Sequence, residues 1–485
     1  MKRKIYEKLL EWKRTSNGRS AVLIDGARRI GKSWIAEEFA RNEYESYLLI
    51  DFSKVSKEVK GFFEDYLEKL DVFFMYLLGA YNAKLTPRKS VIIFDEVQKF
   101  PRAREAIKHL VADGRFDYIE TGSLISIRKN VEKILIPSEE HHIEMFPMDF
   151  EEFLWATGNS GLMPIVRNSF DSLRPVGAGM HRRILEVFRQ YEIVGGMPQA
   201  VNEFVRSHDL AKVDFEKRTI IDLYRADILK YGGRSKHKIL GVFNAIPGAL
   251  ASHGWQFSPG AVRQGAGMRE FDAAFEWLRS SMMVNVAYNA TDPNVGLELS
   301  SDHRSLKCFL GDTGLLVSMA FGENELIRGE VQQRLLTGRL SVNAGMIYEN
   351  LVAQMLRASG QQPYFHVEYD TESGKPTMEV DFLVAKSNLQ RRHNIVPIEV
   401  KSANAYTTKS LDRFTAKFAD YSAMACVLHE KDLERTPNRI CLPVYMAGLG
   451  GLMEIGRTPR VSPFVARDQG LLREAVPLVG ARDEH

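Results

Sequence analysis

The first 150 residues place short apolar runs between segments that are polar or of helical period. A short continuous apolar run is typical of a strand buried on both faces, as in a parallel sheet covered by helices. This pattern holds for residues 21–24, 47–51 and 91–94, and residues 116–120 and 142–145 are further candidate strands. Ahead of the first run, Ile5, Leu9 and Trp12 recur at roughly helical spacing and predict an amphipathic helix. The pattern therefore predicts an α/β domain built on a parallel sheet.

Residues from about 155 to 235 have helical periodicity instead. Apolar residues between 184 and 191 recur at helical intervals, and the sequence Gly195-Gly196-Met197-Pro198 then ends that helix. We expect this segment to form a helical lid, joined by a hinge at residues 231–238 to the next part of the chain.

A different order of elements occupies residues 236–310. Residues 242–246 and 271–278 have helical spacing, and residues 284–288 and 297–299 predict a hairpin. Helices followed by a hairpin suggest a winged-helix module. Such modules bind DNA or mediate protein contacts, and the thin basic set Arg263, Arg269 and Arg279 does not decide between the two.

Composition narrows the class of protein only a little. At 485 residues we expect about three domains. The formal net charge of +3 says little about nucleic acid, so any basic surface must be local. Cys308, Cys426 and Cys441 are scattered, which excludes a disulfide framework or a metal-type spacing and fits a reducing compartment. With no apolar run long enough to cross a bilayer and no signal-peptide pattern, we expect a cytoplasmic protein without a membrane partner.

The first candidate site is a glycine-containing loop between the strand at 21–24 and a helix-forming segment at 34–40. The loop consists of Gly26, Ala27, Arg28, Arg29, Ile30, Gly31, Lys32 and Ser33. Its glycines allow a tight turn, so that successive backbone N–H groups point at phosphate oxygens, and the positive end of the following helix adds to the attraction. Lys32 would reach the outer phosphates, and the Ser33 hydroxyl would bind Mg²⁺. Spacing and context together predict a nucleotide-binding loop rather than an ordinary turn.

Two acids come directly after the strand at 91–94. Acids at the carboxyl end of a buried parallel strand lie beside the phosphate loop. We expect Asp95 to hold the Mg²⁺ shell, and Glu96 to orient the water that attacks the γ-phosphate. A helix N-terminal acidic pair is the alternative, and the upstream phosphate loop disfavours it. Thr121 and Ser123, after the strand at 116–120, either sense the γ-phosphate or form a polar turn.

The chain resembles prokaryotic AAA-type ATPases that carry a C-terminal domain related to restriction-endonuclease folds. The resemblance rests on the phosphate loop together with residues 94–98, 120–123, 146–154, 191–198, 224–228 and 311–316. It implies ATP as the ligand, an AAA-like sheet order and a possible homo-oligomer. Such ATPases commonly use an arginine to stabilise transition-state charge, and Arg102, Arg104, Arg128 and Arg225 are the candidates.

A second constellation lies in the C-terminal part. Glu399 and Lys401 alternate along a strand and so share one face, and Asp381 heads the preceding strand. Glu349 lies on a segment that predicts a helix packed nearby. These residues resemble the acidic and lysine core of restriction-endonuclease-like nucleases. By that resemblance Glu349, Asp381 and Glu399 would bind Mg²⁺ against a scissile phosphate, and Asp381, Glu399 and Lys401 would be catalytic.

These patterns predict an α/β protein with five segments. We expect an AAA-like core at 1–155, a helical lid at 156–235 and a winged-helix-like module at 236–310, then a restriction-endonuclease-like domain at 311–447 and a loosely ordered tail at 448–485. The leading hypothesis is an ATPase whose nucleotide cycle controls a nuclease-like domain acting on or docking to DNA or RNA. The alternative is a nucleotide-driven switch that recruits a protein partner.

Overall fold

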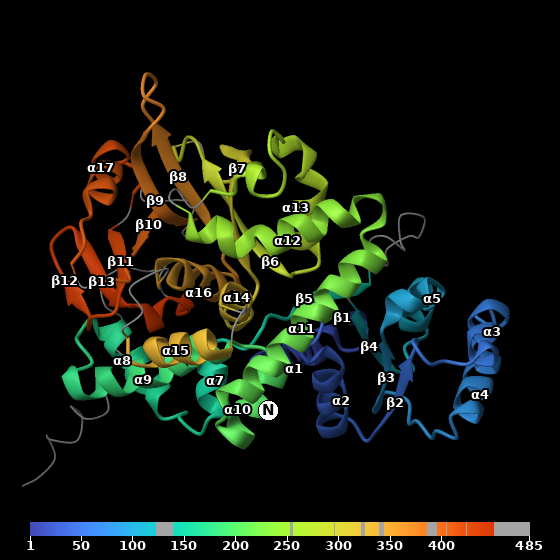
Figure 1. Ribbon diagram of the computed structural model, residues 1–485. Coiled ribbons are helices and arrows are strands. Elements are labelled where there is room, and N and C mark those ends of the chain that lie inside the picture. Colours follow the sequence, from blue (N-terminus) through green and yellow to red (C-terminus); the bar gives the residue numbers. More distant parts are fainter. Residues whose placement is uncertain are drawn as a thin grey trace, which may run out of the picture.

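Two sheets stand at opposite sides of the molecule, with helices between them (Figure 1). The structure is a computed structural model, and it describes residues 1–122, 139–252, 256–294, 296–321, 325–338, 344–385, 395–403, 405–422 and 424–450. Within these ranges no helix has both the length and the apolar character that crossing a membrane requires. The expected tail therefore lies almost wholly outside the described residues.

The N-terminal sheet contains the five strands that the apolar runs predict. They are β1 (Ala21–Asp25), β2 (Ser46–Asp51), β3 (Ser90–Asp95), β4 (Asp117–Gly122) and β5 (Glu140–Glu144). All are parallel and lie in the order β2-β3-β4-β1-β5. The carboxyl ends of β1, β3 and β4 therefore meet at one edge, where the phosphate loop and the acids come directly after them.

Helices cover both faces of this sheet, so the central strands β1 and β3 are buried along their whole length, whereas the edge strand β5 is largely polar and buries Ile143. The helices are α1 (Ile5–Ser16), α2 (Lys32–Glu43), α3 (Lys57–Asp65), α4 (Leu70–Ala80) and α5 (Pro101–Asp113), with a short turn η1 (Val97–Lys99) before α5. Alternate residues of β1 point to opposite faces. Val22 and Ile24 belong to the core that includes α1 and α2, whereas Ala21 and Leu23 belong to the core that includes α3, α4 and α5.

The expected lid is helical. It comprises α8 (Leu162–Ser172), α9 (Ala178–Val194), α10 (Pro198–Ser207) and α11 (Leu210–Tyr231), and α7 (Phe150–Ala156) precedes it at the end of the expected core. Asp149 caps α7, with Glu152 completing a reciprocal capping box. The same Glu152 accepts a hydrogen bond from the buried Arg3 Nε at 3.1 Å. Arg3 also donates to the carbonyls of Ile30 (2.9 Å) and Phe146 (2.7 Å), so one side chain fixes α7 to the phosphate loop.

The middle segment does not form a separate hairpin module. After the turn η2 (Gly233–Ser235) come α12 (Lys236–Ala251), the turns η3 (Pro259–Ala261) and η4 (Met268–Glu270), α13 (Asp272–Ser280), β6 (Val284–Ala290) and β7 (Ser301–Leu310). Strands β6 and β7 pair as the expected antiparallel hairpin, but they form one end of an eight-stranded sheet. The second strand begins at Ser301, and the prediction of a strand at 297–299 is wrong.

The remaining elements complete that second sheet. They are α14 (Thr313–Ala320), α15 (Glu325–Leu336), α16 (Ala344–Ala358), β8 (Tyr364–Tyr369), β9 (Pro376–Ala385), β10 (Ile395–Val400), α17 (Lys409–Lys417), β11 (Ala425–His429), β12 (Glu434–Arg435), β13 (Arg439–Pro443) and η5 (Val444–Met446). The strand order is β12-β13-β11-β10-β9-β8-β6-β7, with mixed directions. Helix α16 packs on one face and α17 on the other.

Lid and second sheet meet at a close backbone contact. A Cβ added to Gly195 would lie 2.8 Å from the Cα of Gly314, so neither position accepts a side chain without movement. The buried Asp312 stabilises this contact by accepting hydrogen bonds from the backbone N–H groups of Gly196 (2.6 Å) and Leu315 (3.0 Å). Because both sides are buried and hydrogen-bonded, the lid and the second sheet form one packed unit.

A buried acid at this interface makes stability depend on pH. Burial, with repulsion from Glu430, raises the pKa of Glu192 to about 8. The folded chain then keeps a proton that the unfolded chain releases above about pH 4.5, so the free energy of unfolding falls as pH rises from about 4.5 to about 8. The loss is on the order of 1.4 kcal/mol per pKa unit of difference.

We therefore expect Glu192→Gln to lose less stability than the wild type between pH 5 and about pH 9, because the amide cannot ionise. Urea unfolding at the two pH values measures the difference. The matched control is Glu186→Gln, which changes an exposed acid on the same helix. Equal pH dependence in wild type and Glu192→Gln would contradict the prediction.

Candidate functional site

The phosphate loop lies between β1 and α2, with the backbone geometry that the glycines allow. Gly31 caps α2 with φ of +93°, in the left-handed region. Gly26 has φ of +156°, and a Cβ there would lie 2.4 Å from the Met145 carbonyl oxygen. Arg29 also has a positive φ of 70°. The loop thus folds tightly against the N-terminus of α2, where phosphate oxygens are attracted.

Lys32 bends back over the loop. Its ammonium donates to the carbonyls of Gly26 (3.0 Å) and Ala27 (2.9 Å). Burial lowers the pKa of Lys32, and the nearby carboxylates of Glu96, Asp25 and Asp95 oppose that shift. A buried ammonium held by carbonyls is a group that an incoming phosphate can engage with a stronger, charge-assisted bond.

Ser33 and Asp95 are in direct contact, as the predicted metal role requires. The Ser33 hydroxyl donates to Asp95 Oδ1 at 2.6 Å. Thr121 donates a short hydrogen bond to the same oxygen. The structure therefore brings together Ser33 at the start of α2, Asp95 at the end of β3 and Thr121 near the end of β4, whereas Ser123 lies outside the described residues. Hydroxyl and carboxylate oxygens are the hard ligands that Mg²⁺ prefers, so this donor set fits Mg²⁺.

Glu96 stands beside Asp95 in a strained backbone conformation. Its φ is +54°, in a region that residues other than glycine rarely adopt. Gln98 Nε2 donates to Glu96 Oε2 at 2.6 Å and so holds the carboxylate. The sequence prediction does not include Gln98 among the site residues. Its position two residues after Glu96 is a local signal that could have identified it.

The end of α11 lies across the opening of the site. Arg28 Nη1 pairs with Asp227 at 2.6 Å, and Tyr224 donates to the Arg28 carbonyl at 3.1 Å. Lys99 donates to the Tyr231 hydroxyl at 2.6 Å. The first residue of the predicted flexible hinge is therefore hydrogen-bonded to a residue of the site. The end of α11 is thus in direct contact with the phosphate loop and with the turn after β3.

Two cavities flank the loop. One, of about 590 Å³, is lined by Lys32, Asp95, Glu96, Lys99, Lys230 and Trp277 among others. The other, of about 720 Å³, lies between the loop and the start of α10 and includes Trp34 and Gln199. Both cavities include Lys32, which fits a site that extends to either side of the loop.

Of the four arginines predicted to stabilise transition-state charge, the three in the described residues do not line these cavities. Arg102 pairs with Glu105, Arg225 pairs with Asp222, and Arg104 is buried against Glu140. Arg128 lies outside the described residues. The cations that do line the cavities, besides Lys32, are Arg3, Arg28, Arg29, Lys99 and Lys230.

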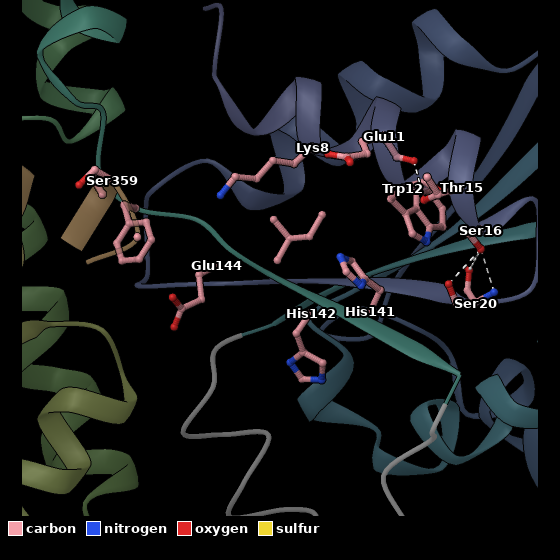
Figure 2. A pocket seen from close by; sticks show the side chains of 14 residues that line it. Lys8, Glu11, Trp12, Thr15, Ser16, Ser20, His141, His142, Glu144 and Ser359 are labelled. Carbon is pink, nitrogen blue, oxygen red and sulfur yellow. Dashed lines mark hydrogen bonds between the residues drawn. The ribbon is translucent and has the colours of Figure 1, made fainter. Parts of the chain in front are cut away.

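A third cavity, of about 890 Å³, lies between α1, β5 and the end of α16 (Figure 2). His141 and His142 both line it, and Figure 2 shows their rings on opposite sides of the strand, as alternation predicts. Across the described ranges, no group of three or more histidine, cysteine, aspartate or glutamate side chains is arranged to hold a metal ion. None of the phosphate-loop residues, all of which the structure describes, lines this cavity.

The C-terminal residues singled out from the sequence do converge. Asp381 on β9 accepts a hydrogen bond from the Val400 N–H at 2.8 Å, which places it beside Glu399 on β10. Lys401 Nζ lies 2.5 Å from Glu399 Oε1. Glu349 reaches the same cluster from α16. Burial raises the pKa of Glu399 to about 8, with repulsion from Asp381 adding to the effect.

Two further members of this cluster are missing from the sequence prediction. Lys307 on β7 is fully buried, and its Nζ lies 3.1 Å from Glu379, 3.6 Å from Glu349 and 3.9 Å from Asp381. Burial lowers the pKa of Lys307, but the carboxylates outweigh burial and hold its pKa above the ordinary value. The expected Mg²⁺ site therefore has an ammonium group at its centre, which is why the acids are not arranged around a metal.

Comparison with known proteins assigns one part of the chain. Residues 18–154 match a family model described as an AAA domain. Residues 185–325 and 344–446 match models described as domains of unknown function, DUF8612 and DUF4143. The comparison with curated proteins found no match.

Two solved structures share weak similarity with this chain. The Walker-type ATPase PABY2304 of Pyrococcus abyssi is 13% identical over 66% of this chain and 95% of its own, with a TM-score of 0.37. Cdc6p from Pyrobaculum aerophilum is 10% identical over 68% of this chain and 93% of its own, with a TM-score of 0.25. Similarity at this level carries no conclusion about function. The family match, with the parallel sheet and the loop described above, shows that residues 18–154 are an AAA-type P-loop ATPase domain.

Proposed function

We propose that this protein binds ATP with Mg²⁺ at the loop 26–33 and hydrolyses it. The observation that carries the proposal is the 2.6 Å contact between the Ser33 hydroxyl and the Asp95 carboxylate. It places two hard oxygen ligands side by side, next to a buried lysine and a helix N-terminus. An ordinary strand-to-helix turn has no need of that combination.

Each residue of the site has its own part in the reaction. Backbone N–H groups of the loop and Lys32 bind the phosphates, and Ser33 and Asp95 would hold Mg²⁺. When bound, Mg²⁺ supplies positive charge that stabilises the charge developing on the phosphates. Glu96 orients and polarises the attacking water, and Thr121 keeps Asp95 in place through its hydrogen bond. Arg28, Lys99 and Lys230 offer positive charge from the same chain at the opening.

Phosphate release from ATP tests this proposal directly. We expect turnover with Mg²⁺ and loss of turnover when EDTA removes the metal, since no other cation pairs with Ser33 and Asp95 in the described site. Turnover that is unchanged in EDTA would contradict the assignment of Ser33 and Asp95.

A second candidate function concerns the C-terminal cluster. We propose that the nucleotide cycle controls a metal-dependent nuclease site there, with Glu349, Asp381 and Glu399 as metal ligands and Lys401 beside the reacting water. The observation in its favour is that these four side chains, from α16, β9 and the end of β10, meet in one largely buried cluster. Should cleavage be absent, the domain serves instead to dock nucleic acid or a protein partner. Assembly of several copies stays a prediction.

A further inference from the structure

The acid cluster contains more negative than positive groups. Four carboxylates, those of Glu349, Glu379, Asp381 and Glu399, surround two ammonium groups, those of Lys307 and Lys401. Glu349 is 4% exposed and Glu399 is 6% exposed, and because burial raises the pKa of both groups, protons compensate part of this excess near neutral pH. A buried excess of carboxylates is costly unless a cation or a proton compensates it.

Several polar atoms in the cluster have no hydrogen-bond partner within the described part of the chain. They are Glu349 Oε2, Glu379 Oε1, Glu399 Oε2 and Lys307 Nζ itself. The ammonium lies within ion-pair distance of the acids, but outside hydrogen-bonding geometry. Buried polar groups are rarely left in this state. These oxygens can therefore accept a divalent cation, which binds several carboxylates at once at shorter distances than the Lys307 ammonium does here.

We propose that the Lys307 ammonium occupies the position of a divalent metal in this cluster, so that Mg²⁺ or Mn²⁺ enters only when Lys307 is withdrawn. The proposal deepens the second candidate function above and rests on it for its biological role. Lys401 does not occupy such a metal position, because its Nζ forms an ion pair with Glu399 and its side chain is part-exposed.

Lys307 lies on the hairpin β6–β7, and the chain that leads into this hairpin borders the nucleotide site. Its strand β7 pairs with β6, where Ala287 lies opposite Lys307. The chain just before β6 supplies Trp277, Ser281 and Met283 to the 590 Å³ cavity beside Lys32. One continuous segment thus borders the nucleotide site at one end and carries the internal cation at the other.

The test uses a substitution that removes the internal ion pair without changing the net charge. Lys307→Met with Glu379→Gln leaves Glu349, Asp381 and Glu399 as ligands. Electron paramagnetic resonance of Mn²⁺, without nucleotide, measures binding to the full chain. We expect the double variant to bind one Mn²⁺ at least roughly tenfold more tightly than the wild type, because the ammonium no longer occupies the position between the three remaining acids. Lys307→Arg, which keeps the charge, should behave as the wild type does.

Adding Asp381→Asn to the double variant shows where the ion binds, since this change should abolish the new site and leave any binding at the phosphate loop. A folded double variant that binds Mn²⁺ no better than the wild type would overturn the proposal. A wild-type crystal soaked in Mn²⁺ gives an answer without substitution, because an anomalous peak among the acids with Lys307 still in place would also overturn it.

Cleavage is scored separately on a gel. If the double variant binds Mn²⁺ through Asp381 and cuts neither DNA nor RNA, the nuclease function fails while the role of Lys307 stands.

Discussion

Lys32→Ala is expected to weaken ATP binding by about a hundredfold and to remove measurable turnover. The reason is that Lys32 supplies the buried ammonium of the phosphate loop, and a hydrogen bond to a charged group contributes about 1.5–3 kcal/mol. Its hydrogen-bond partners among the described residues are the carbonyls of Gly26 and Ala27, so phosphate gains this ammonium without breaking an ion pair. Fluorescence titration with a labelled ATP analogue measures the affinity.

The matched control is Lys89→Ala, which removes an exposed lysine paired with Glu45 at 2.7 Å. It should bind ATP as the wild type does, since surface ion pairs contribute little. Circular dichroism shows whether Lys32→Ala is folded. Binding within about threefold of wild type by a folded Lys32→Ala would remove the loop from the proposed site.

Glu96→Gln should keep ATP binding and lose turnover by about a hundredfold or more, which is the usual effect of a positioned acid or base. Glutamine has the same shape, so Ser33 and Asp95 keep their contact and the phosphate ligands are unchanged. What is lost is the negative charge that polarises the attacking water. Single-turnover phosphate release, with nucleotide affinity measured on the same sample, separates the two effects.

Glu105→Gln is the control for this substitution, because Glu105 lies on the nearby α5 and pairs with Arg102 on the surface. It should leave turnover unchanged. If Glu96→Gln hydrolyses ATP as fast as the wild type, another group must orient the water, and the strained backbone at Glu96 would need a different explanation.

The N-terminal fold could be predicted from the sequence because its signals are local. A strand buried on both faces is mostly apolar, as β1 and β3 are, and all five predicted strands overlap strands of the structure. The phosphate loop needs glycine at fixed places, and that spacing is a property of eight consecutive residues. The hydrogen bond from Arg3 to the Ile30 carbonyl could not be predicted. The two residues meet only because α7, which also binds Arg3, folds beside the phosphate loop.

The C-terminal cluster could be predicted only in part. Alternation along a strand places Glu399 and Lys401 on one face, and the same rule applied to β9 would have added Glu379 to Asp381. Lys307 gave no local signal, because β7 begins with the polar run Ser301-Asp302-His303-Arg304 and the acids that pair with Lys307 lie far away in the chain. A lysine becomes a member of this site only through long-range packing.

The contact between Gly195 and Gly314 has a consequence for exchanging parts between related proteins. Each glycine leaves the space into which the backbone of the other fits, so both positions must stay glycine for the contact to form. A chimera joined anywhere between them inherits one glycine from each parent. Such a chimera closes the lid against the second sheet only when both parents carry glycine there, however well the two halves fold in their own proteins.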